Sequence, residues 1–203
     1  MVLKNERDLS KIKRMLAWYN MIPNLIWSIL NLAPISIYCF TLLNYKTFYV
    51  FLAASLIPIF LKNSFLDKLQ IGKTIKIYKQ LGVHLVNKVA QNGVIINNLI
   101  KRKFPAHKVV TSKKSSVSGL IGRTYIFEKF HLILFLFFSL TMIYAFLKEH
   151  WAWACVILLT NIAYNIYPNL LQQYIRVKLI LFSKKLNRNS SPTSLPPNIS
   201  NLV

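Results

Sequence analysis

Four long apolar runs, separated by short polar segments, set the pattern of this chain. They cover residues 18–43, 48–61, 130–147 and 151–171. A helix needs about 20 residues to cross ~30 Å of hydrocarbon. The second run has only 14 residues, which predicts a short span that its turn residues and Lys62 extend. The pattern therefore predicts an all-α integral membrane protein with four transmembrane helices in two hairpins.

The polar segments complete the predicted organisation. No small-residue cleavage site ends the first apolar run, so we expect an uncleaved helix rather than a signal peptide. The predicted parts are a basic N-terminus (1–16), a transmembrane hairpin (17–61), a basic interfacial region (62–129), a second hairpin (130–171), an amphipathic basic extension (172–186) and a disordered tail (187–203).

The basic interfacial region has its own pattern. From Phe65 to Phe104 apolar residues recur every three or four positions between lysines, which predicts amphipathic helices on the membrane surface. Gly82 and the stretch 91–93 interrupt the pattern and predict turns. Residues 108–119 form a polar stretch of low complexity, and we expect a mobile loop there.

Charge gives the predicted helices an orientation. The chain is 54% hydrophobic, yet 26 Lys and Arg against 5 Asp and Glu give a net charge of +21. All but Lys46 and Lys148 of these basic residues lie in residues 1–14, 62–129 and 176–188. The positive-inside rule therefore places these segments and both termini in the cytosol. The apolar runs argue against a nucleic-acid partner, whereas the basic segments favour anionic lipid headgroups or phosphorylated ligands.

Few residues could hold a metal or a disulfide. Cys39 and Cys155 both lie in apolar runs, and we expect free, small core residues there. Both are near the outer ends of their helices, so a disulfide stays the less favoured alternative. The histidines are scattered and carboxylates are scarce, so we expect neither a metal nor a cofactor.

A stripe of polar side chains follows one side of the last apolar run. On an unbroken helix of about 100° per residue, its members lie within about 40° of one line. Polar groups at membrane depth normally face a protein interior or a water-filled cavity, which predicts that the stripe lines a site. Helix association is an equally good explanation for the first two members. The stripe consists of Asn161, Asn165, Asn169, Gln172 and Arg176.

A second polar group precedes the third apolar run. Glu128 and His131 are three residues apart, so on a helix they share a face. The carboxylate could then hold one imidazole nitrogen while the other faces a substrate hydroxyl, as a general base requires. A simple ion pair at a helix start is the alternative. Because the third run starts and the fourth ends on the cytosolic side, we expect His131, Glu128 and the stripe to converge on one interfacial pocket.

The end of the fourth run resembles a known family. Asn165 and Pro168, followed by Gln172-x-Tyr174-x-Arg176-x-Lys178-Leu179, are similar to the Asn-Pro-Gln-Arg-Tyr-Asn-Arg-Pro-Arg-Leu signature of the bacterial glycosyl-diaponeurosporenoate acyltransferases, which complete staphyloxanthin-type carotenoids.

Two further motifs occur in the order found in that family. Its Glu-x-x-His matches Glu128 and His131, and its Gly-ended basic stretch matches residues 81–93. The resemblance covers about residues 77–179. The chain departs from the family at residues 86–93, where Val-Asn-Lys-Val-Ala-Gln-Asn-Gly stands for Trp-Lys-Asp-x-Leu-Pro-Asp-Gly. If the missing Trp and Asp contact the glycosyl carotenoid, the acceptor of this protein differs.

The resemblance implies an O-acyltransferase of the bacterial cytoplasmic membrane. Its donor would be a cytosolic fatty acyl thioester and its acceptor a hydroxyl of a lipid or carotenoid glycoside. His131 would act as base with Glu128 as its orienting partner. We expect an oxyanion donor in Asn165 or Gln172, and phosphate contacts from Arg176 and Lys178.

Two points stay open at this level. Tyr174 falls opposite the stripe on an unbroken helix, so it is either rotated inward or an interface anchor. The same polar groups also suit a non-enzymatic membrane scaffold or assembly factor that binds anionic lipid or a protein partner. A small transporter is less favoured, because the spans offer no carboxylate near the middle of the membrane. The sequence does not predict the oligomeric state.

Overall fold

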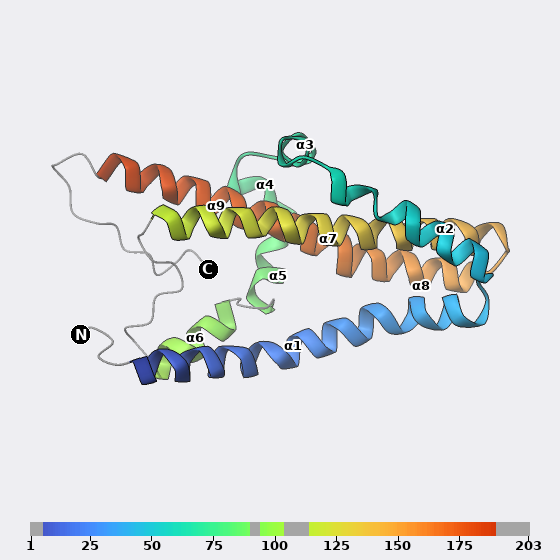
Figure 1. The fold of residues 1–203 in the computed structure, drawn as a ribbon, viewed down its shortest axis with the longest axis horizontal. Coiled ribbons are helices and arrows are strands. Elements are labelled where there is room, and N and C mark those ends of the chain that lie inside the picture. The colour runs from blue at the N-terminus through green and yellow to red at the C-terminus, as the bar shows by residue number, and fades with distance from the viewer. Residues whose placement is uncertain (1–5, 90–93, 104–113, 190–203) are drawn as a thin grey trace. The chain divides into compact units, whose positions relative to one another are not determined.

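The computed structural model describes residues 6–89, 94–103 and 114–189, and all regular secondary structure in these residues is helical (Figure 1). This confirms the predicted all-α class. The elements are α1 (Glu6–Thr41), α2 (Tyr45–Ser55), the 3-10 helix η1 (Ile57–Phe60), α3 (Asn63–Leu69), α4 (Ile75–Gln80), α5 (Val83–Val89), α6 (Val94–Lys103), α7 (Lys114–Leu147), α8 (Trp151–Asn161), the π-helix η2 (Ile162–Ile166) and α9 (Tyr167–Asn189).

Three helical stretches are long and apolar enough to cross a membrane. They are Ser10–Thr41, Val117–Leu147 and Trp151–Arg188, found among the described residues. The predicted second span is present only as a broken helix: Tyr45–Phe60 and Asn63–Leu69 meet at a bend of 100°, and together they would make a fourth crossing. Leu61 and Lys62 are extended and interrupt the helical hydrogen bonds, so the helix cannot continue straight.

The chain divides into two compact units, which we describe separately. The first unit comprises residues 1–25, 72–123 and 174–203, and the second comprises residues 26–71 and 124–173. All residues of the second unit are described.

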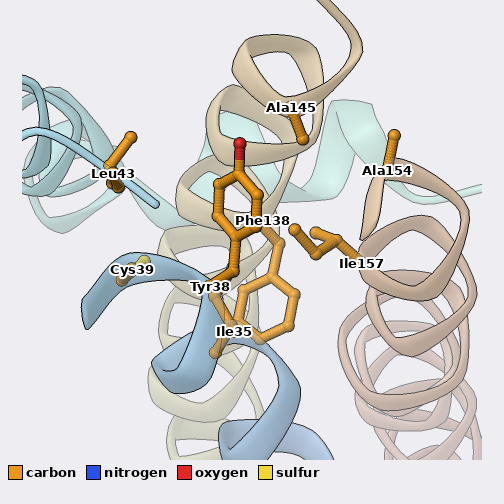
Figure 2. Packing of buried hydrophobic residues seen from close by; sticks show 8 residues of the cluster. All are labelled: Ile35, Tyr38, Cys39, Leu43, Phe138, Ala145, Ala154 and Ile157. Atoms are coloured by element: carbon orange, nitrogen blue, oxygen red, sulfur yellow. The ribbon is translucent and has the colours of Figure 1, made fainter. Parts of the chain in front are cut away.

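The core of the second unit is formed by four helices. Side chains of α1, α7 and α8 meet there, and Phe48 and Phe51 of α2 pack against them. In Figure 2, Ile157 of α8 points towards Tyr38 and Phe138, whose rings lie between the helices. The Tyr38 hydroxyl is 3.1 Å from Nδ1 of His150 in the turn after α7. Burial of these large side chains joins the helices at the end of the unit opposite to His131.

The bent segment between α2 and α3 is attached to α7. The ammonium group of Lys129 donates to the carbonyl of Ile59 at 3.2 Å, which satisfies one of the carbonyls that the end of η1 leaves free. The Tyr125 hydroxyl donates to Asp67 Oδ1 at 2.8 Å. These two bonds place the chain on both sides of the bend beside the turns of α7 that carry Glu128.

Large apolar side chains also cover the outside of the helices. Phe40 is 88% exposed, Phe60 84% and Leu147 73%. A water-soluble protein rarely exposes contiguous apolar surface on this scale. The exposed apolar faces agree with a location in the membrane.

In the first unit, the beginning of α7 is helical, and Val117 attaches it to α9. Val117 is 1% exposed and packs against Leu179 and Phe182 of α9. The prediction of a mobile loop over residues 108–119 is therefore wrong for residues 114–119, which are helical. The packing of Val117 stabilises this start of the helix. Residues 108–113 lie outside the described part of the chain.

Three smaller predictions can be compared directly. Gly82 lies in a turn with a φ of 73°, which confirms the turn that its sequence predicted and which favours glycine. The stretch 91–93 and the tail from residue 190 lie outside the described residues, while residues 187–189 still belong to α9. Both cysteines are free, and Cys39 is buried, but Cys155 is exposed, so its assignment to the core was wrong.

Candidate functional site

The last long helix contains a π-helical turn that the sequence pattern did not predict. The helix runs without a break from α8 through η2 into α9. A π turn bonds residues five apart and so accommodates one residue more than an α turn. Positions beyond Ile166 are therefore rotated relative to the unbroken helix on which the polar stripe was drawn. Gln173, 4% exposed, is buried where Gln172 was expected, and Gln172 is only half-buried.

Asn161 and Asn165 are joined in a hydrogen-bond chain that starts on α7. Nδ2 of Asn161 is 3.3 Å from the carbonyl of Phe135 and 3.1 Å from Oγ of Ser139. Nδ2 of Asn165 donates to Oδ1 of Asn161 at 2.9 Å. Because the Phe135 carbonyl can only accept, the Asn161 amide nitrogen must be the donor, and the Asn161 oxygen is left to accept from Asn165. The remaining amide oxygen of Asn165 is consequently a hydrogen-bond acceptor.

His131 lies beside this chain. It contacts the Asn165 side chain and the backbone of Tyr164. Its Nδ1 is buried and has no hydrogen-bond partner among the described residues, and the same holds for Oδ1 of Asn165 and Oδ1 of Asn169. A buried polar atom without a partner costs about 1–3 kcal/mol. The first two lie side by side, because His131 contacts Asn165. Buried polar groups without partners of this kind occur at catalytic and binding sites.

Glu128 does not hold His131 in the way the sequence suggested. Its Oε1 accepts a hydrogen bond from Nε2 of Gln173 at 2.8 Å. Oε1 of Gln173 accepts in turn from the backbone N–H of Ile71 at 3.2 Å. Glu128 is 1% exposed, so its bond to Gln173 is shielded from water, whereas the bond from Ile71 is only partly buried. The Glu128–Gln173 pair therefore connects α7 and α9 to the chain that follows α3.

The other predicted site residues belong to the first unit. Tyr174 is 3% exposed and its ring lies 6.1 Å from that of Tyr78, so it is an interior residue rather than an interface anchor. Nζ of Lys178 lies 4.5 Å from the centre of the Tyr174 ring, in a cation–π contact. Arg176 is fully buried, which leaves it unsuited to bind the phosphates of a soluble donor.

Of the predicted site residues, the structure brings His131 and Asn165 into contact. Glu128 lies one turn before His131 on α7 and bonds Gln173, which the sequence analysis did not select. Ser139 and Asn161 complete the chain. The Gln172-Gln173 pair was visible in the sequence, but only knowledge of the π turn distinguishes the two positions.

The arrangement offers acceptors to a donor-rich ligand at the edge of an apolar interior. A comparison with protein families is consistent with this chemistry. The model of the CrtO family, glycosyl-4,4'-diaponeurosporenoate acyltransferase, matches residues 62–185, which is more than half of the chain. No curated protein and no solved structure matches the chain.

The match contains the stretch 77–179 on which the resemblance rested, and it includes His131, Asn165, Glu128 and Gln173. The family acts as an acyltransferase on carotenoid glycosides. The helix α1 lies outside the match. The chain belongs to the CrtO family of glycosyl-4,4'-diaponeurosporenoate acyltransferases.

Proposed function

We propose that this protein transfers a fatty acyl group from a cytosolic thioester to a hydroxyl of a carotenoid glycoside or a related lipid glycoside. The observation that carries the proposal is the pair of buried polar atoms, Nδ1 of His131 and Oδ1 of Asn165, which lie on two side chains in contact and make no geometrically satisfactory hydrogen bond with the described residues. A sugar hydroxyl is both a hydrogen-bond donor and the nucleophile of such a reaction. In the tautomer with the proton on Nε2, His131 presents Nδ1 as an acceptor beside the Asn165 oxygen. The two atoms can then bind hydroxyls of the glycosyl group and prepare one of them for reaction.

His131 is the general base of the proposed reaction. It removes the proton from the acceptor hydroxyl as the oxygen attacks the thioester carbonyl carbon. A C–O ester bond forms and the C–S bond breaks. The leaving thiolate takes up the proton from the imidazolium, so that a thiol is released and His131 is neutral again. A positioned base of this kind contributes typically a factor of 10² to 10⁴ in rate.

Asn165 positions the acceptor rather than the oxyanion. Its amide nitrogen is bonded to Asn161, and its oxygen is an acceptor that suits a second sugar hydroxyl. This replaces the oxyanion role that the sequence suggested for Asn165.

Glu128 is a positioning residue in this proposal. Through Gln173 it fixes the side of α9 that follows the π turn, and it lies one helical turn from His131. The basic side chains Lys101, Arg102 and Lys103 at the end of α6 would attract an anionic donor such as a coenzyme A thioester from a distance, which needs no direct contact at the site.

Mass spectrometry of pigment and lipid extracts tests the reaction. Cells that produce glycosyl carotenoid are compared with and without this gene. We expect a species heavier by one fatty acyl group only in cells with the gene, and its loss in the variant His131→Ala at equal membrane abundance. The control variant His150→Gln changes a histidine beyond the far end of α7 and should retain the product. An unchanged set of lipids and pigments would refute the proposed function.

A further inference from the structure

Helix α1 carries a buried amide at Asn31. Asn31 is 8% exposed, and its Oδ1 is buried without a hydrogen-bond partner among the described residues. It belongs to the second unit, as do His131 and Asn165. This oxygen therefore makes no hydrogen bond to a neighbouring helix among the described residues.

Contacts on either side of Asn31 fix its level in the unit. One turn before it, the ring of Trp27 lies 5.0 Å from that of Tyr164, in an edge-on contact. One turn after it, Ile35 packs in the cluster that contains Ile157 of α8. Since α1 and the last helix run in opposite directions here, Asn31 is level with the residues midway between Tyr164 and Ile157. Asn161 occupies that position.

These contacts also put the same side of α1 next to the proposed site. Residues 27, 31 and 35 are four apart and share a face of the helix. The backbone of Tyr164, whose ring Trp27 contacts, touches His131. Asn31 lies one turn further along α1, about 6 Å deeper than Trp27.

We propose that α1 forms a wall of the acceptor site and that Oδ1 of Asn31 accepts a hydrogen bond from a hydroxyl of the glycosyl group. This inference rests on the proposed function. His131 and Asn165 hold the reacting hydroxyl, and Asn31 binds a second part of the same sugar, deeper in the membrane. The ligand chemistry is that of a polyol with an apolar chain, because the free atoms of the site are acceptors and the core beyond Asn31 is apolar.

The choice of ligand explains why the amide is kept. A leucine at position 31 would remove an unpaired polar atom from an apolar interior. It would therefore leave stability unchanged or raise it. An amide that costs stability in the free protein is expected where it binds a substrate.

Acyl-transfer kinetics of the full chain in lipid nanodiscs test the assignment. The donor is palmitoyl-coenzyme A and the acceptor is glycosyl-4,4'-diaponeurosporenoate, at a varied mole fraction. For Asn31→Leu we expect the acceptor KM to rise about 3- to 10-fold, as one lost hydrogen bond implies. The kcat, the donor KM and the thermal midpoint should stay near the values of the unchanged protein. Asn31→Ser, which keeps an oxygen acceptor, should give a smaller rise and serves if the leucine variant does not insert.

Thr160→Val is the matched control. Thr160 is beside Asn161, and its hydroxyl donates to carbonyls of its own helix at 2.9 and 3.0 Å, so its removal should not alter the acceptor KM. If Asn31→Leu lowers the thermal midpoint and leaves the acceptor KM unchanged, Asn31 joins helices and the inference is wrong. If the unchanged protein does not acylate the glycoside at all, the proposed function itself fails.

Discussion

Replacing Gln173 and Gln172 in turn gives the sharpest test of the π turn. Gln173→Leu would remove two hydrogen bonds, a buried one to the Glu128 carboxylate and a partly buried one from the backbone of Ile71. A bond to a charged group contributes about 1.5–3 kcal/mol and a neutral one about 1 kcal/mol. We therefore expect Gln173→Leu to lower the free energy of unfolding by about 3 kcal/mol.

Gln172→Leu is the matched control, because Gln172 is half-buried and makes no such bond with the described residues. Its effect should stay within about 0.5 kcal/mol. Equilibrium unfolding in mixed SDS micelles, followed by circular dichroism, measures both variants. An unbroken α-helix would instead bury position 172. A larger loss for Gln172→Leu than for Gln173→Leu would refute the rotated register.

Two further predictions concern neighbouring contacts. Asn161→Leu breaks the hydrogen-bond chain from Phe135 to Asn165 and leaves the Asn165 amide free to turn. We expect the free energy of unfolding to fall by about 1–3 kcal/mol and the rate of acyl transfer to be reduced. Full activity would show that Asn165 does not need Asn161. Val117→Ala opens a space in the cluster with Leu179 and Phe182 and should cost about 2 kcal/mol, whereas Ser118→Ala, at an exposed position, should cost less than about 0.5 kcal/mol; equal values would mean that the first turns of α7 are not packed.

The apolar runs were sufficient to predict the helical class and the three helical stretches that are long and apolar enough to cross a membrane. The tendency of a run to enter a membrane is a sum of free energies of transfer from water, and each residue contributes to that sum independently of its neighbours. The bend of 100° after Phe60 was not predictable in this way, because it depends on contacts such as Lys129 with Ile59 and Tyr125 with Asp67. The helical start of α7 was missed for a similar reason: Val117 becomes helical by packing on α9.

The sequence predicted some residues of the candidate site correctly, but not which of them are hydrogen-bonded to each other. His131 and Asn165 were selected from spacing and polarity, and they are in contact. The expected bond from Glu128 to His131 assumed that neighbours on one helix face pair with each other. The π turn instead rotates Gln173 to the position where it donates a hydrogen bond to Glu128. A shift of one residue in the helical register thus gave Glu128 a different partner. The spacing of polar and apolar residues in the sequence does not predict this shift.

The proposed reaction depends on His131 as the base that activates a glycosyl hydroxyl. The most direct measurement is the single-turnover rate of transfer from palmitoyl-coenzyme A to glycosyl-4,4'-diaponeurosporenoate by purified protein in nanodiscs, compared with His131→Ala and His150→Gln. The account predicts a rate at least about 100-fold lower for His131→Ala and an unchanged rate for His150→Gln. A His131→Ala variant that inserts normally and transfers at a rate within about threefold of the unchanged protein would contradict it.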